Sequence, residues 1–138
     1  MTKLTALEKM IAGILVDSAI HRKGNLTYSE ITDILWKNYG QKVNPHYGLS
    51  APLGNIARLC YELGLPLLSV RVQYKNSTAE KAASGFYEIA CELKPQYRQM
   101  KPEEVRNIEL KLTRECTDWK QLISCLDPGT QSAVSEHN

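Results

Sequence analysis

The chain contains four cysteines and three histidines, the residue types that most often bind metals or act as nucleophiles. No two cysteines are spaced as a CxxC pair, and the histidines are scattered along the chain. A zinc finger or zinc ribbon needs ligand pairs at short spacing, so neither is predicted. The cysteines recur instead among apolar residues at helical spacing, as Cys60 does after Ile56 and Ala57, which is typical of buried thiols. We expect no metal and no cofactor.

Nucleophilic catalysis and nucleotide binding also leave recognisable local patterns, and the sequence lacks them. An activated serine or cysteine needs a base and an orienting group within hydrogen-bond reach. No histidine lies near such a partner in the sequence. Neither GxxxxGK[ST] nor GxGxxG occurs, so the phosphate-binding loops of those types are not predicted. We therefore expect a protein that is not an enzyme.

The remaining polar side chains favour contacts with DNA. Tyr28 and Ser29 open one predicted helix and Ser50 opens another, and helix starts suit the phosphate backbone. Asn55 and Arg58 lie on the outward side of the later helix, where such side chains read bases in a major groove. The expected DNA-binding residues are Tyr28, Ser29, Lys42, Asn44, His46, Tyr47, Ser50, Asn55, Arg58, Lys75, Asn76 and Lys81.

These side chains need a scaffold, and the spacing of apolar residues predicts three helices to carry them. The first spans residues 4–22. The second begins near Tyr28 and stops at Gly40, because glycine suits a helix C-terminus. Trp36, near the end of this second helix, is expected to be buried or half-buried.

The third helix is the most clearly bounded of the three. Ser50 is a good N-cap, Pro52 fits the first turn, and Gly64 ends the helix. The loop before it, residues 41–49, is longer than the turn of a tight helix-turn-helix. A looser variant of that motif is therefore expected.

Two strands and a polar loop complete the predicted fold. Residues 67–74 alternate apolar and polar side chains with the period of a strand. The polar segment 75–84 would form the tip of a wing, and residues 86–93 its return strand. The sequence therefore predicts an α+β fold, a winged helix-turn-helix with a β-hairpin wing and extra N- and C-terminal helices.

Length, composition and charge limit the class of protein. The 138 residues suit one domain over residues 1–128, followed by a disordered tail over 129–138. No apolar run approaches the roughly 20 residues that span a membrane, and the N-terminus lacks a signal-peptide pattern, so a cytoplasmic protein is expected. Residues 1–101 carry 13 Lys/Arg and 8 Asp/Glu, a net charge of +5. Residues 102–138 carry 4 and 7, a net charge of −3. A mildly basic body is compatible with a polyanionic partner.

Four short segments resemble the DNA-binding domain of the alkyltransferases and alkyltransferase-like proteins. They are TYSEI at 27–31, APLG at 51–54, SVRV at 69–72 and GF at 85–86. They follow the order of that family's TYGDIA-type, RAVG-type, PCHRV-type and G-G-[FY] motifs, over about 60 residues. The resemblance implies a winged-helix fold that binds DNA.

Two departures limit what this resemblance implies about activity. Ser69 or Leu67 stands where the family has its reactive cysteine, so alkyl transfer is not implied. Ala51 stands where the family has the arginine that fills the place of a displaced base. Nucleotide flipping is therefore not carried over, although Tyr28 matches the tyrosine of the family's motif.

A second pattern runs from Tyr28 through Gly85-Phe86 to Asp118-Trp119 and resembles small domains of phage and restriction-associated proteins. We expect a non-enzymatic DNA-binding winged-helix protein that acts in regulation, restriction or phage–host conflict. The alternative is a protein-interaction module, such as an inhibitor acting on a nucleic-acid enzyme, which the modest basic charge favours. The expected partners are DNA or a protein but no membrane, and the chain is expected to be a monomer or homodimer.

Overall fold

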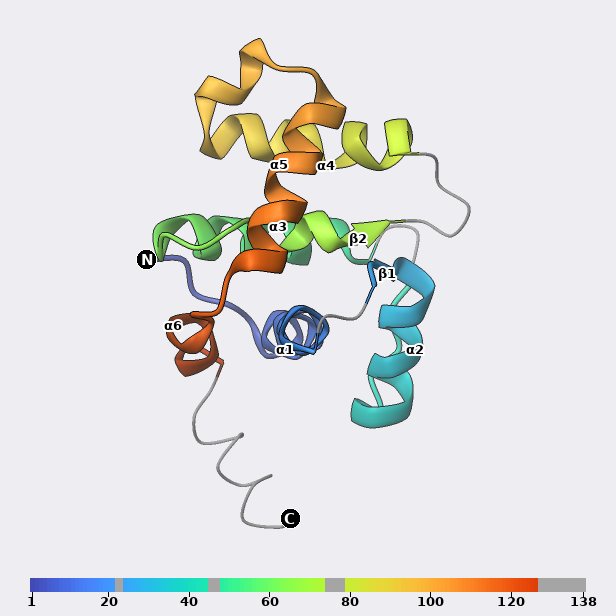
Figure 1. The fold of residues 1–138 in the computed structure, drawn as a ribbon. Helices are drawn as coiled ribbons and strands as arrows, with labels where there is room; N and C mark the ends of the chain where they lie inside the picture. The colour runs from blue at the N-terminus through green and yellow to red at the C-terminus, as the bar shows by residue number, and fades with distance from the viewer. Residues whose placement is uncertain (22–23, 45–47, 74–78, 127–138) are drawn as a thin grey trace.

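The computed structural model describes residues 1–21, 24–44, 48–73 and 79–126, and within 79–85 it describes the backbone alone. These residues form helices around one hydrophobic core, with a small parallel sheet of two strands at one edge (Figure 1). The arrangement is thus mostly helical with a minor β component. Within these ranges no helix combines the length and the hydropathy needed to cross a membrane.

Six α-helices and two short strands make up the described fold. β1 pairs with β2 in parallel, with Thr27 opposite Gln73, so α2 and α3 form the crossover between the strands. α4 packs along α5, α1 packs along α3, and η1 contacts both α3 and α5. In chain order the elements are α1 (Ala6–Ile20), β1 (Leu26–Thr27), α2 (Tyr28–Tyr39), α3 (Ser50–Glu62), the 3-10 helix η1 (Leu68–Arg71), β2 (Val72–Gln73), α4 (Ala79–Leu93), the 3-10 helix η2 (Pro95–Gln99), α5 (Pro102–Glu115) and α6 (Lys120–Ser124).

Capping side chains start the first two helices. In α1, Glu8 N donates to Thr5 Oγ1 at 3.1 Å, and Thr5 N donates to Glu8 Oε1 at 2.9 Å. Thr27 and Glu30 repeat this reciprocal box at the start of α2. Gly40 ends α2 with φ of 65°, a conformation that glycine adopts at little cost. These boundaries follow from local chemistry that is visible in the sequence.

The start of α3 differs from the prediction by one position. Ser50 is the first residue of the helix, and Leu49 takes the N-cap position without a side-chain hydrogen bond. Leu49 is almost fully buried, so packing of its side chain anchors this end of the helix in place of a polar cap. The helix ends before Gly64, whose φ is 72°.

The predicted return strand of the wing is wrong. Residues 86–93 form the second half of α4, and Gly85 lies inside that helix instead of opening a strand. Phe86 and Ala90 are one helical turn apart and both are buried. A run that alternates every two residues can satisfy a helical period as well, and here the helix prevails. The described residues therefore contain no β-hairpin.

The predicted strand over residues 67–74 shrinks to β2. Its first part turns into η1, in which Leu68, Ser69 and Arg71 are all buried. The alternation in the sequence predicts that one side of this segment faces solvent. That side is not exposed, because α3 and α5 both contact η1. The backbone N–H of Leu67 donates to the Glu109 carboxylate at 2.9 Å, so it is satisfied without a neighbouring strand.

Trp36 is exposed, so the prediction that it is buried or half-buried is wrong. Its position relative to the core explains the exposure. Ile31 and Leu35 form the buried side of α2, and Trp36, one residue further on, points about 100° away from Leu35 and is 60% exposed. Each fully buried large apolar side chain stabilises the fold by about 1.5–3 kcal/mol. The largest such side chains are those of Trp119, Ile11, Leu15, Ile31, Leu35, Leu49, Ile56, Leu59, Leu67, Leu68 and Leu122.

Candidate nucleic-acid interface

The structure distributes the described members of the predicted DNA-binding set over α2, the segment that follows it, α3 and α4. Tyr28 is half-buried at the start of α2, and four predicted residues are exposed: Ser29, Lys42, Asn44 and Ser50. Four further residues lie outside the described ranges: His46, Tyr47, Lys75 and Asn76. Lys81 belongs to α4, and its side chain is not described.

Asn55 and Arg58 are brought together, but by partners within the chain. Asn55 Nδ2 donates to Glu8 Oε2 at 2.7 Å, and Arg58 Nη1 donates to Asn55 Oδ1 at 3.3 Å. Arg58 Nη2 also donates to Glu92 Oε2 at 2.9 Å. This chain of contacts joins α1, α3 and α4.

These contacts engage the polar side of α3 with carboxylates of α1 and α4. Glu8 is buried, so Asn55 supplies a hydrogen bond that a buried carboxylate needs. The pair of Arg58 and Glu92 is largely exposed, and such pairs contribute about 0–1 kcal/mol. The side of α3 predicted to read bases is therefore occupied by neighbouring helices and their carboxylates.

A different cationic feature lies where η1 meets α5. Arg71, at the end of η1, is only 2% exposed. Its Nη1 donates to Thr113 Oγ1 of α5 at 3.4 Å, and its Nη2 donates to Ser18 Oγ of α1 at 3.3 Å. Both hydroxyl groups help to position the guanidinium of Arg71. We call Arg71, Arg106 and Arg114 the arginine cluster.

Arg106 and Arg114 bring α5 into this cluster. Arg106 is 9% exposed, and its Nη2 donates to Gln73 Oε1 of β2 at 2.9 Å. Arg114 is exposed two turns further along the same helix, next to Thr113, which contacts Arg71. The cluster thus extends from a buried base at Arg71 to an exposed end at Arg114.

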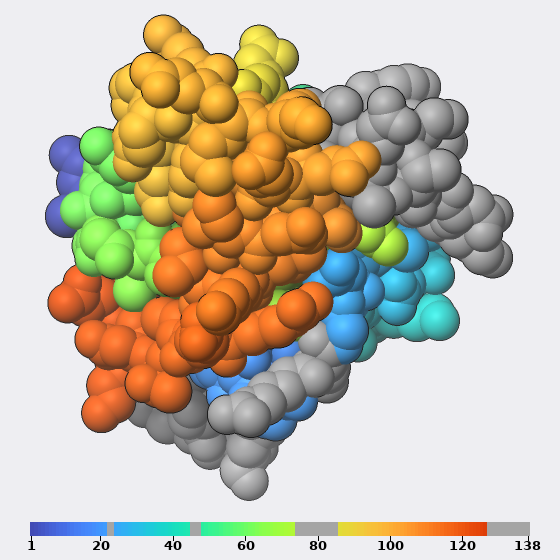
Figure 2. All heavy atoms as spheres, turned by 45° about the horizontal axis from the view of Figure 1, so that its top comes forward, coloured from blue at the N-terminus to red at the C-terminus, as the bar shows by residue number. Residues whose placement is uncertain are grey.

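The arginine cluster also adjoins the start of α2. Gln73, which accepts from Arg106, pairs with Thr27, the N-cap of α2. Figure 2 shows α5, in orange, at the surface beside the blue segment that carries the end of β1 and the start of α2. Ser29, one of the predicted phosphate contacts, is exposed in the first turn of α2. The start of α2 therefore lies close to Arg106 of the cluster.

The charge of Arg114 acts on the other two guanidinium groups. Burial, followed by the positive charge of Arg114, lowers the pKa of Arg71. The same two causes, in the same order, lower the pKa of Arg106. An arginine stays charged at neutral pH even so, because its ordinary pKa lies far above neutrality. The exposed Arg114 therefore brings positive charge close to Arg106, and an anion bound beside these two would be favoured.

Sequence reasoning missed this cluster because its members are far apart in the chain. Arg71 lies within the apolar run LLSVRV, where the alternation predicts the polar side of a strand. Arg106 and Arg114 lie in the C-terminal region, whose net charge of −3 does not indicate an anion-binding surface. Their spacing of eight residues, about two helical turns, was the available signal, because it places both on one side of α5.

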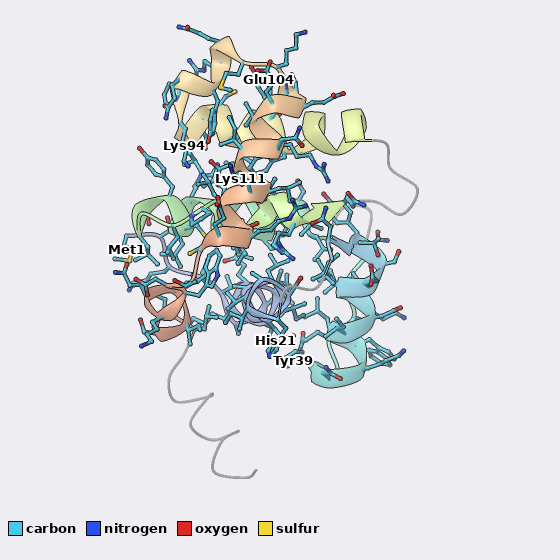
Figure 3. All side chains as sticks on the ribbon, viewed as in Figure 1. Met1, His21, Tyr39, Lys94, Glu104 and Lys111 are labelled. Atoms are coloured by element: carbon cyan, nitrogen blue, oxygen red, sulfur yellow. The ribbon has the colours of Figure 1, made fainter. Side chains whose placement is uncertain are left out.

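A second buried polar group lies on α5 and serves the fold. Glu109 is fully buried, and its carboxylate accepts from Leu67 N at 2.9 Å and from Lys94 Nζ at 2.8 Å. It also accepts from the hydroxyl of Tyr97, whose pKa is raised first by burial and then by this contact. Lys94, labelled in Figure 3, thus links the end of α4 to α5. The Glu109 carboxylate thus accepts from three donors that lie on other parts of the chain.

The buried thiol of Cys60 leads to a prediction about alkaline pH. Burial, with smaller contributions from Cys116 and Glu109, raises the pKa of the Cys60 thiol from 9.0 to about 11. The unfolded chain ionises this thiol at lower pH than the folded chain does, so the stability due to the protonated thiol is lost between pH 9 and 11. Urea titrations at pH 8 and pH 11 should show wild type losing about 2 kcal/mol more than Cys60→Ala. Equal losses of stability in wild type and Cys60→Ala would contradict a raised pKa of the Cys60 thiol.

Metal binding and nucleophilic catalysis were the other kinds of site considered for the described residues. No group of three or more His, Cys, Asp or Glu side chains is arranged there to hold a metal. Ser69 is buried, and its hydroxyl makes no hydrogen bond within the described ranges. A serine nucleophile needs a base in contact with its hydroxyl, and nothing described activates this one. No family model, curated protein or solved structure matches the chain.

Proposed function

We propose that the protein is a non-enzymatic DNA-binding protein that holds backbone phosphates between the arginine cluster and the start of α2. The observation that carries the proposal is the gathering of three arginines where η1 meets α5: Thr113, next to the exposed Arg114, contacts Arg71, and Arg106 contacts Gln73. Guanidinium groups bind phosphate oxygens with two parallel hydrogen bonds, and burial of neighbouring charges strengthens that attraction. Arg114, Arg106 and the exposed Ser29 are the phosphate contacts, and Arg71 supports them from behind.

The salt dependence of duplex binding tests this proposal. Each phosphate contact contributes a slope of about −0.9 to a plot of log affinity against log salt concentration. Two to three contacts should therefore weaken binding by roughly 12- to 40-fold between about 50 and 200 mM salt. Fluorescence anisotropy with a labelled duplex measures this change. Undetectable binding at low salt, or an affinity independent of salt, would contradict the proposal.

A protein-interaction module is the second candidate, because several large apolar side chains are exposed. Tyr61 on α3 is 46% exposed, and Leu112 on α5 is 39% exposed. Aromatic side chains of this kind are enriched at the centres of protein interfaces. A partner protein bound through them would show weak salt dependence, in contrast to DNA bound through arginines.

A further inference from the structure

Arg106 on α5 is a buried charge that has no acidic partner in the part of the chain that the structure describes. The residue is only 9% exposed. The ion pairs within the described ranges involve His21, Arg58 and Lys94, and none of them includes Arg106. Buried charges in proteins are usually paired, because a charge removed from water without a counter-charge is costly. A bound anion would supply the counter-charge of Arg106.

The side chain of Gln73 holds the Arg106 guanidinium in place. Gln73 Oε1 accepts from Arg106 Nη2 at 2.9 Å. An amide oxygen is a neutral acceptor, so it orients the guanidinium without cancelling its charge. The guanidinium has further N–H donors in a planar fork, which suits the two oxygens of a phosphate. The contact with Gln73 therefore prepares Arg106 for an anion.

The backbone of Gln73 connects this contact to the start of α2. Gln73 lies opposite Thr27 in the parallel pair of β1 and β2, and Thr27 is the N-cap of α2. Figure 1 shows this strand pair between α5 and the start of α2. The first N–H groups of a helix also favour a negative charge. The strand pair therefore sets the distance between two groups that attract anions.

Two acidic residues are close to these groups in the sequence, and neither pairs with Arg106. Glu30 Oε1 accepts from the backbone N–H of Thr27 at 2.9 Å, as part of the capping box of α2. Glu103 is exposed three residues before Arg106 on α5 and takes part in none of the described ion pairs. Arg106 therefore keeps its charge for an external anion.

We propose that Gln73 is the positioning residue of the DNA phosphate site. Its amide orders Arg106 before DNA binds and leaves the charge of the guanidinium to the phosphate. This inference rests on the proposed DNA binding and names the residue that sets the geometry at Arg106. An acidic side chain in the same place would pair with Arg106, and the phosphate would then have to displace it.

Substitutions of Gln73 test the proposal in anisotropy titrations with a labelled duplex. Gln73→Glu should weaken binding about tenfold at low salt, because the new carboxylate pairs with Arg106. The slope of log affinity against log salt concentration should also decrease in magnitude by about one. Gln73→Ala should weaken binding about threefold and leave the slope unchanged, because the guanidinium keeps its charge but loses its orientation.

Three controls separate positioning from general effects of charge and stability. Gln99→Glu places the same negative charge on the exposed η2 and should change affinity by less than about twofold. In an Arg106→Gln background, Gln73→Ala should change affinity by less than about twofold, because no guanidinium is left to orient. The thermal unfolding midpoint of Gln73→Glu should not fall, because backbone hydrogen bonds hold the strand pair.

The outcomes distinguish this inference from the proposed function. Wild-type affinity and slope in Gln73→Glu would overturn the inference, and so would equal losses in Gln73→Glu and Gln99→Glu. A loss from Gln73→Ala that persists in the Arg106→Gln background would also overturn it. None of these three results affects the proposed function if wild type binds the duplex with the expected salt dependence. A wild type that binds no duplex would contradict the proposed function itself.

Discussion

Glu109→Ala is expected to lower the free energy of unfolding by about 3–5 kcal/mol. The substitution removes a fully buried carboxylate that accepts hydrogen bonds from Leu67, Lys94 and Tyr97. The buried N–H of Leu67 and the hydroxyl of Tyr97 would lose their partner, and the charge of Lys94, with its side chain 19% exposed, would lose its counter-ion. Urea unfolding followed by tryptophan fluorescence measures the loss.

Two further variants make the Glu109 experiment specific. Glu109→Gln keeps one acceptor oxygen and the shape of the side chain, so it should lose less stability than Glu109→Ala. Glu115→Ala removes an exposed carboxylate from the same helix and should change stability by less than about 0.5 kcal/mol. A loss below about 1 kcal/mol for Glu109→Ala would show that Lys94 and Tyr97 find other partners.

The double variant Arg106→Gln/Arg114→Gln is expected to weaken duplex DNA binding about 100-fold at low salt. A hydrogen bond to a charged group contributes about 1.5–3 kcal/mol, and two contacts at the lower value give this factor. The slope of log affinity against log salt concentration should also decrease in magnitude by about two. Anisotropy titrations of the single and double variants at two salt concentrations measure both quantities.

Matched substitutions distinguish phosphate contact from a general change of charge. Arg98→Gln removes an exposed arginine from η2 and should leave DNA affinity within about twofold. Arg106→Lys keeps the charge but not the fork of the guanidinium, so it should fall between wild type and Arg106→Gln. If Arg58→Gln weakened binding more than Arg114→Gln, α3 and not α5 would be the main contact.

The parts of the fold that the sequence predicted correctly depend on short-range chemistry. Thr5 with Glu8 and Thr27 with Glu30 are capping pairs three residues apart, and Gly40 ends α2 by its own backbone preference. Such signals act within one helical turn, so no tertiary information is needed to interpret them. The order of helices up to α3 was predictable for this reason.

The parts that were wrong or missed depend on neighbours distant in the chain. Residues 86–93 fit both a strand and a helix by period, and packing of α4 along α5 decides between them. Arg58 faces outward on a helical wheel, yet Glu92 of α4 lies against it. Arg71 reaches Thr113, and Arg106 reaches Gln73, only because the segment 68–73 lies against α5. The spacing of residues in the sequence does not indicate these contacts between distant segments.

The pairing of β1 with β2 also has a consequence for folding. Each strand contributes only two residues, and the strands are joined through α2 and α3. The contacts between α4 and α5 are closer in sequence, so their loop-closure entropy is smaller and they can form earlier. Thr27 and Gln73 then meet late, so the contact between the start of α2 and the arginine cluster is among the first to separate when the protein opens. Slow exchange of amide hydrogens would be concentrated in α4 and α5, while those of β1 and β2 would exchange sooner.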